Sequence, residues 1–111
     1  MAMSTKLTTI GAGDSISAAV DCSNAIQIWL AMPTDWTSAR LTFQYSPDAG
    51  TSYFDTYELN GAEVAIPVIR NAIVRIDAAI ANKGWLKLRS GSRRYPVPQE
   101  ADRQFVLTII T

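Results

Sequence analysis

The carboxylates and the single thiol are the first candidates for catalysis in this 111-residue chain, which contains no histidine. Histidine most often transfers protons near neutral pH and ligates zinc, so its absence excludes the common serine–histidine and cysteine–histidine pairs and most zinc sites. One catalytic hypothesis remains, a small hydrolase with two carboxylates, either Asp55 with Glu58 or Glu100 with Asp102. Because catalytic carboxylates usually come from different strands, proximity in sequence is weak support, and we predict no catalytic residues.

Cys22 and Asp48 are two further candidates for chemistry, a reactive thiol and a calcium or sugar ligand. As the one cysteine, Cys22 forms no internal disulfide or cysteine metal cluster, and no cation stands beside it to lower the pKa of its thiol. Asp48 supplies a single carboxylate, whereas calcium takes about six to eight oxygens. We therefore predict that Cys22 is structural, that Asp48 shapes a turn, and that the chain holds no metal or cofactor.

Three tryptophans are candidates for binding. Trp29 alternates with Ile28 and Leu30 in a predicted strand, so it lies on the opposite face from them, where it can contact a subunit or a ligand. Exposed together with Trp36 and Trp85, it would stack on sugar rings, as in a carbohydrate-binding module. We favour core packing or subunit contact for the three rings.

A basic cluster stands out in a chain whose ten basic and ten acidic residues cancel. It consists of four arginines late in the sequence: Arg89, Arg93, Arg94 and Arg103. Two alternatives are open for them, pairing with Glu100 and Asp102 in the same segment or contact with an acidic neighbour in an assembly. Most carboxylates lie earlier in the chain, so the neutral total hides a local imbalance.

Composition indicates one globular domain. The length suits a single core, and 48% hydrophobic with 18% charged residues is typical of a folded chain. Zero net charge gives no summed positive field for phosphate backbones or anionic lipid, so we predict neither nucleic acid nor membrane as partner. The N-terminal residues lack the apolar run of a secretory signal, and no stretch approaches the roughly 20 apolar residues of a membrane span.

Alternation with period two dominates the pattern and predicts about eight short strands. The predicted strands are Ile16–Val20, Ile26–Met32, Leu41–Ser46, Glu63–Ile66, Val74–Ile76, Leu86–Arg89 and Phe105–Ile110, with residues 1–12 as an edge strand or a loose arm. Turn residues between them favour a single all-β domain over residues 13–111, an antiparallel β-sandwich of jelly-roll or immunoglobulin-like order. The best helical candidate is one turn at Asp77–Asn82, and Tyr95–Asp102 with its two prolines reads as an extended crossover loop.

Two turn motifs are specific enough to predict local geometry. Asn60-Gly61, between two strand-like segments, predicts a hairpin with a type I′ turn, in which both central residues have positive φ. The segment Ser46–Tyr53 resembles the Asp-box hairpin of sialidases, a structural element in which Asp48 accepts hydrogen bonds from its own turn and Gly50 takes positive φ. A single copy does not indicate a sialidase.

The final strand is apolar on both faces, because Val106 and Ile110 oppose Phe105, Leu107 and Ile109. Such a strand must be covered twice, and we predict that a partner subunit covers the second face unless a loop does. Parity and charge together give the candidate partner contacts: Trp29, Arg89, Arg93, Arg94, Arg103 and Ile110.

The order of several short motifs resembles a family of small structural proteins of tailed phages and prophages, over roughly residues 10–110. The first half contributes Met32-Pro33, Asp35-Trp36-Thr37-Ser38-Ala39, Leu41-Thr42-Phe43-Gln44-Tyr45-Ser46 and Asp48-x-Gly50. The second half contributes Gly61-Ala62-Glu63-Val64, Leu88-Arg89-Ser90-Gly91 and Pro96-Val97-Pro98-Gln99-Glu100-Ala101-Asp102-Arg103.

The resemblance implies a non-enzymatic virion component, most often a capsid decoration or cement protein that stabilises the head shell. It implies the major capsid protein or other virion proteins as partners, a homo-oligomer with a trimer favoured, and the phage head as location after synthesis in the bacterial cytoplasm. It assigns no functional residues. The alternative is a carbohydrate-binding module or a tail or head-fibre adhesin that uses Trp29, Trp36 or Tyr53.

Overall fold

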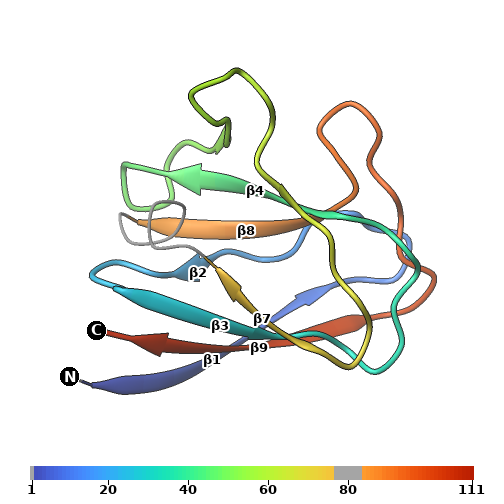
Figure 1. Cartoon of the computed structure of the whole chain (residues 1–111), viewed down its shortest axis with the longest axis horizontal. Coiled ribbons are helices and arrows are strands. Elements are labelled where there is room, and N and C mark those ends of the chain that lie inside the picture. Colours follow the sequence, from blue (N-terminus) through green and yellow to red (C-terminus); the bar gives the residue numbers. More distant parts are fainter. Residues whose placement is uncertain (1, 77–83) are drawn as a thin grey trace.

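A computed structural model describes residues 2–76 and 84–111 and shows an all-β chain, with no helix in those residues (Figure 1). The strands are β1 (Met3–Ile10), β2 (Val20–Asp21), β3 (Gln27–Ala31), β4 (Leu41–Ser46), β5 (Phe54–Asp55), β6 (Ala65–Ile66), β7 (Ile73–Ile76), β8 (Trp85–Ser90) and β9 (Arg103–Ile110). The helical turn predicted at Asp77–Asn82 lies outside the described residues.

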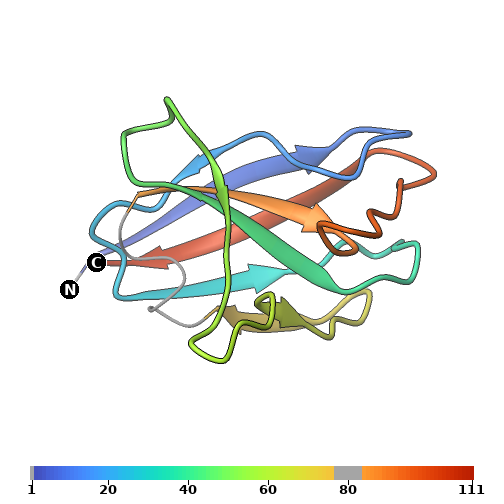
Figure 2. The ribbon, with the colours of Figure 1, turned by 90° about the horizontal axis from the view of Figure 1, so that it is seen from above.

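The strands form two antiparallel sheets that pack face to face, which confirms the predicted β-sandwich (Figures 1 and 2). Sheet A has the order β1-β9-β3-β7, and sheet B has the order β2-β8-β4-β5, with β6 also paired to β4. An immunoglobulin-like order would place β1 beside β2 in one sheet, whereas here they lie in different sheets. Because the chain pairs β1 with β9, β2 with β8 and β3 with β7, it is a long ribbon wrapped into a jelly roll.

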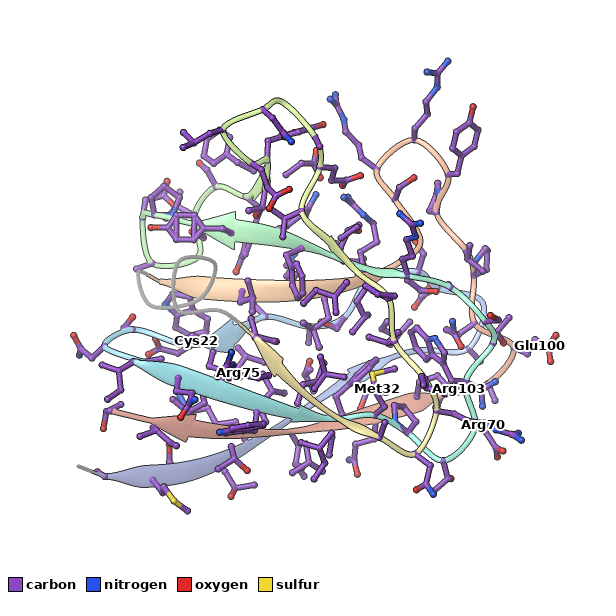
Figure 3. The ribbon with its side chains drawn as sticks, viewed as in Figure 1. Cys22, Met32, Arg70, Arg75, Glu100 and Arg103 are labelled. Carbon is purple, nitrogen blue, oxygen red and sulfur yellow. The ribbon has the colours of Figure 1, made fainter. Side chains whose placement is uncertain are left out.

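The core lies between the sheets and takes one face of every long strand. Phe105, Leu107 and Ile109 enter it from β9, and Leu41 and Phe43 enter it from β4, all of them buried. This is the burial that period-two alternation predicts, since successive side chains of a strand point to opposite faces. Figure 3 shows Met32 between the two sheets.

Two details of the predicted strands are wrong. The alternation of the predicted strand Ile26–Met32 puts Ile26 on the inner face with Ile28, but Ile26 is exposed and Ala25 is buried, because regular pairing of β3 starts only at Gln27. The alternation of Ile16, Ala18 and Val20 likewise puts Ala18 on the inner face, but Ala18 is exposed and Ser17 is buried. Its backbone N–H donates to Leu88 O at 2.8 Å and its Oγ accepts from Leu88 N–H at 3.0 Å, so a polar side chain replaces a missing ladder partner.

The two turn motifs differ from expectation in an informative way. At Asn60-Gly61 the hairpin forms, with Glu58 N–H donating to Ala62 O at 2.8 Å, but only Gly61 has positive φ, so the type I′ prediction is wrong. A three-residue loop with glycine in the left-handed position closes it instead. Consecutive positive φ values, as a type I′ turn requires, occur at Ala49 (58°) and Gly50 (92°).

The Asp-box-like segment is held by the hydrogen bonds that its sequence predicts. Asp48 Oδ1 accepts from Ser46 Oγ and from Ser52 N–H, each at 2.8 Å, and Gly50 N–H donates to Ser46 Oγ at 2.8 Å. The bond from Ser52 N–H and the bond from Ser46 keep the pKa of Asp48 below its usual value. Asp48 therefore stabilises a tight turn.

Candidate functional site

The outer face of sheet A is formed by the side chains that point away from the core. Across the register it contains Met3, Thr5, Leu7 and Thr9 of β1, Gln104, Val106, Thr108 and Ile110 of β9, Gln27, Trp29 and Ala31 of β3, and Ile73 and Arg75 of β7. These residues are apolar or uncharged except for Arg75. Such a face differs from an ordinary protein surface, where charged side chains are frequent.

The apolar residues of this face line up across all four strands. Leu7 lies opposite Val106, Val106 opposite Ala31, and Ala31 opposite Ile73, so one apolar row crosses the sheet. Directly opposed side chains of neighbouring antiparallel strands contact each other, so the row is a continuous surface.

The neighbouring row is mixed and holds the one charge. Thr5, Thr108, Trp29 and Arg75 follow one another across the sheet in the same way. Their order places the Trp29 ring between a threonine and a guanidinium, so this row offers an aromatic surface with one cation beside it.

No described segment of the chain covers this face. Met3 and Ile73 are each 69% exposed, Leu7 is 59% exposed and Trp29 is 38% exposed. Val106 and Ile110 of β9 are only partly buried. The sequence predicts that a loop or a partner covers the second face of β9. Within residues 2–76 and 84–111 no loop covers it, so a partner is the alternative that is left.

Strand alternation in the sequence predicts two of the residues on the outer face of sheet A and misses the others. Trp29 and Ile110 lie on the outer face as their alternation predicts. Met3, Leu7 and Ile73 were not singled out, because they join this surface only through the register of β1 with β9 and of β7 with β3. The sequence signal for Met3, Leu7 and Ile73 was an alternation within short segments that contain few apolar residues.

The outer side of sheet B contains a charged network that the chain satisfies itself. Arg89 is buried, and its Nη1 donates to Asp55 Oδ1 at 2.7 Å while its Nη2 pairs with Glu63. Its Nε donates to Thr42 Oγ1 at 2.9 Å. Arg93 joins at the margin, with Nε 3.3 Å from Asp55 Oδ2. A buried guanidinium needs such partners, because an unpaired charge in the interior is costly.

Asp55 shows the electrostatic consequence of this network. Partial burial raises the pKa of its carboxyl, but hydrogen bonds from Arg89 and Gln44 and the charges of Arg89 and Arg93 outweigh that effect. The pKa of Asp55 is therefore lower than usual, so the carboxylate form is held in the folded chain. Asp55 therefore serves as the counter-ion of Arg89.

The network overturns one of the two alternatives for the arginine cluster. Pairing with Glu100 and Asp102 is wrong, since the ion pairs of the described residues run from Arg89 and Arg93 to Asp55 and Glu63. Asp102 Oδ1 instead accepts from the backbone N–H of Ala12 at 2.8 Å. The reason is topological: the 95–102 segment crosses to sheet A, whereas β5 and β6 pair with β4, the strand next to β8 in sheet B.

The two remaining arginines of the cluster have no carboxylate within 4 Å among the described residues. Arg94 lies at the tip of the β8–β9 loop with its guanidinium 5.6 Å from the Tyr95 ring centre. Arg103 is 9% exposed, and neutral groups hold it: Nε donates to Gln99 Oε1 at 3.0 Å and Nη2 to Thr37 Oγ1 at 3.3 Å.

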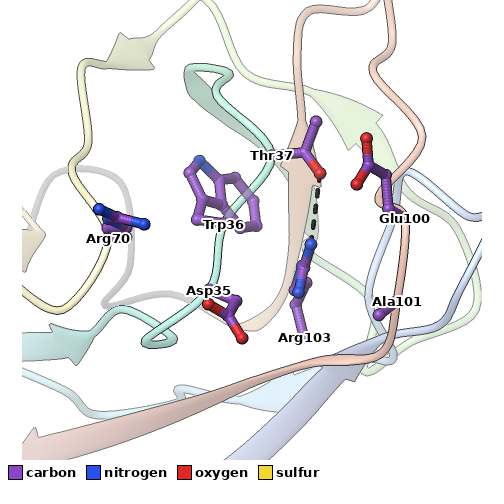
Figure 4. Close-up of a pocket in the computed structure, with 7 residues that line it drawn as sticks. All are labelled: Asp35, Trp36, Thr37, Arg70, Glu100, Ala101 and Arg103. Atoms are coloured by element: carbon purple, nitrogen blue, oxygen red, sulfur yellow. Dashed lines mark hydrogen bonds between the residues drawn. The ribbon is translucent and has the colours of Figure 1, made fainter.

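Arg103 opens onto a shallow pocket of about 500 Å³ at one end of the sandwich (Figure 4). Asp35, Trp36, Arg70 and Glu100 line it as well. Figure 3 places Arg70, Glu100 and Arg103 at the same end of the molecule. Two cations and two carboxylates balance here, so the pocket does not select a ligand by charge.

The tryptophans do not share a surface. Trp36 packs edge-on against Phe105 with ring centres 5.6 Å apart, and its Nε1 donates to Ala39 O at 3.2 Å. Trp85 starts β8 and is half-buried on the side of sheet B, opposite Asp21 and Ser46 in the register. Only Trp29, on sheet A, is exposed among the three, so they form no row for a sugar chain.

Other candidates for chemistry are enclosed or absent in the part of the chain that the structure describes. Cys22 is fully buried, and burial raises the pKa of its thiol to about 11, so the thiolate is scarce at neutral pH. Within residues 2–76 and 84–111, no three acidic or cysteine side chains gather as metal ligands, and no helix is long and apolar enough to span a membrane.

Compared with models of known families, with curated proteins and with solved structures, the chain matches none of them. The resemblance to phage structural proteins therefore stays a prediction from its motifs.

Proposed function

We propose that this chain is a non-enzymatic structural protein of a phage virion, a decoration or cement protein that binds the head shell through the outer face of sheet A. The observation that carries the proposal is the uncovered apolar row of Leu7, Val106, Ala31 and Ile73. Contiguous apolar surface of this kind marks binding sites for other proteins.

The face also limits the chemistry of its partner. It contains one charge, Arg75, which lies next to Trp29 in the register. A fitting partner therefore presents an apolar patch with an acidic side chain placed to meet Arg75, in the pattern of a hydrophobic centre with a polar margin. We propose the major capsid protein, or another virion protein with such a patch, as that partner.

A glycan-binding role, as in a carbohydrate-binding module or an adhesin, is the alternative. Exposure of the Trp29 ring favours it, because an exposed aromatic ring can stack on a sugar. Jelly rolls recur among both viral capsid and lectin domains, so the fold is compatible with both proposals and selects neither. Shell binding is better supported, since the exposed surface is a row of aliphatic side chains and not a set of rings.

The test is deletion of the encoding gene from the phage or prophage genome that contains it. We expect the protein to copurify with intact heads of the parent, and heads without it to lose DNA at lower temperature or lower salt. Adding back the purified chain should restore resistance. Heads of unchanged heat and salt resistance would contradict the cement role, and binding to a glycan array that Trp29→Ala abolishes would favour the alternative.

A further inference from the structure

β1 is the one long, unprotected edge among the described strands. The other edge strands are short, with four residues in β7 and two each in β2, β5 and β6. β1 has eight residues and contains neither proline nor glycine. Proteins usually shorten, charge or bend an exposed edge strand, because its free backbone groups pair with other chains.

The hydrogen-bond pattern shows which backbone groups of β1 are free. Ala2 and Thr111 exchange both of their backbone bonds, at 3.1 and 2.9 Å. Bonded pairs recur at every second residue of an antiparallel ladder, so the backbone groups of Ser4 and Lys6 also face β9. The backbone N–H and C=O of Met3, Thr5 and Leu7 point the other way in the plane of the sheet, toward its open edge. No other described backbone group bonds these three residues.

Features that could block this edge leave its first half open. Ile10 is bridged to Ser17, which ends the free stretch at the far end of β1. The side chain of Lys6 turns inward, and its Nζ donates to Asp21 O at 2.9 Å, so its charge does not project from the edge. Met3–Leu7 is thus free to accept another strand, and Figure 1 shows the N-terminal half of β1 at the margin of sheet A.

We propose that a second copy of this chain adds to sheet A through β1, antiparallel and with Thr5 at the two-fold axis. Thr5 then exchanges two backbone bonds with the partner's Thr5, and Met3 does so with the partner's Leu7. The pairing joins two four-stranded sheets into one, with both outer faces on the same side. It goes beyond the proposed function and holds whatever the outer face binds.

Charge and packing select this register over its neighbours. Centred on Thr5, Met3 meets Leu7 on the outer face, and Lys6 meets Ser4 on the inner face. Centred on Lys6, the two lysines would be directly opposed, which destabilises a strand pair. Centred on Leu7, the new strand would run against the Ile10–Ser17 bridge. The proposed pairing also continues the apolar row, since Leu7 begins it at the edge.

Disulfide trapping in the full chain tests the register. Opposed residues of a bonded antiparallel pair have Cα atoms about 5.5 Å apart, within reach of a disulfide. We expect Thr5→Cys to form a cross-linked dimer on mild oxidation, and an equal mixture of Met3→Cys and Leu7→Cys to form the mixed dimer. Met3→Cys alone is the matched control and should not cross-link. Cys22 does not compete, because it is buried with a raised pKa.

Sedimentation of the unmodified chain and of edge variants tests the pairing itself. We expect a dimer that Thr5→Pro converts to monomer, since its N–H makes no bond within the chain and its loss spares the fold. Thr5→Lys, which opposes two like charges, should do the same and serves if the proline variant does not fold. A monomeric or trimeric unmodified chain, or equal cross-linking of Met3→Cys and Thr5→Cys, would overturn the inference. Shell binding by monomeric Thr5→Lys would leave the proposed function intact.

Discussion

The outer faces of the two sheets are built in opposite ways. On sheet B, Arg89 is paired with Asp55 and Glu63, and Lys87 lies 4.1 Å from the centre of the Tyr53 ring. The partners come from residues 47–64, which rise above β4 in Figure 1. The outer face of sheet A has a single charge among the described residues, Arg75, and no described segment covers it.

This difference shows how a small domain divides its surface. The charged groups on the outer side of sheet B are paired by contacts that the chain supplies itself. Sheet A keeps apolar side chains exposed, at a cost in solvation that binding would recover. We therefore infer that sheet B stabilises the monomer and that sheet A is the binding side.

Breaking the cover of sheet B should have the largest effect on stability. Arg89→Met leaves Asp55 and Glu63 without their shared cation, and removal of one partner from a buried ion pair typically costs about 3–5 kcal/mol. Urea unfolding measures the loss. Arg94→Met, at an exposed loop tip with no ion pair in the described chain, is the control and should change stability by less than about 0.5 kcal/mol. Equal effects would contradict a self-contained network on sheet B.

Two adjacent residues of β9 compare the faces of sheet A. Leu107 is fully buried, so Leu107→Ala should lower the free energy of unfolding by about 2–5 kcal/mol through lost burial and a cavity. Val106 lies on the outer face, and Val106→Ala should cost less than about 1 kcal/mol in the free chain. Thermal or urea unfolding separates the two, and a large loss for Val106→Ala would mean that the outer face is already covered.

Acid should weaken sheet B through Asp55. Its pKa is lowered in the folded chain, so its contribution to stability is complete above the ordinary value near 3.9 and is lost as the pH falls through the folded value. We expect the free energy of unfolding to drop from pH 5 to pH 3, and to drop less in Asp55→Asn. Urea titrations at both pH values measure this. Identical pH dependence of the two proteins would show that Asp55 does not cause the loss of stability in acid.

The smallest effect on the free chain should come from the margin of sheet A. Ile73 is exposed on the edge strand β7, so Ile73→Ser removes no core contact and should shift the free energy of unfolding by less than about 0.5 kcal/mol. Binding of a hydrophobic dye to the folded protein should fall, because part of the apolar row is gone. Unchanged dye binding would show that the row is not an accessible surface.

Alternation predicted much of this fold because one face of each strand is buried. Leu41–Ser46 forms a strand with the predicted bounds, and Phe105, Leu107 and Ile109 enter the core as expected. The two-residue strand β5 was missed, since Phe54–Asp55 is too short to show an alternation. The partners of Arg89 were missed for another reason, because 34 residues separate it from Asp55.

Part of the candidate binding face could be predicted from the sequence. The two apolar sides of β9 pointed to a second covered surface, and Trp29 and Ile110 were placed on it by parity. Met3, Leu7 and Ile73 become part of it only when the jelly-roll order sets β1 and β7 at the two edges of one sheet. That order depends on contacts between distant strands, which no local pattern encodes.

Binding of purified variants to heads that lack the protein tests the central claim most directly. Val106→Glu places a charge in the middle of the apolar row, one strand away from the β1 edge. Leu59→Glu makes the same kind of change at the exposed tip of a hairpin outside that face. We predict that both variants fold, that Leu59→Glu binds heads like the unmodified chain, and that Val106→Glu loses binding at least tenfold. Full binding by folded Val106→Glu would contradict the assignment of sheet A as the binding side.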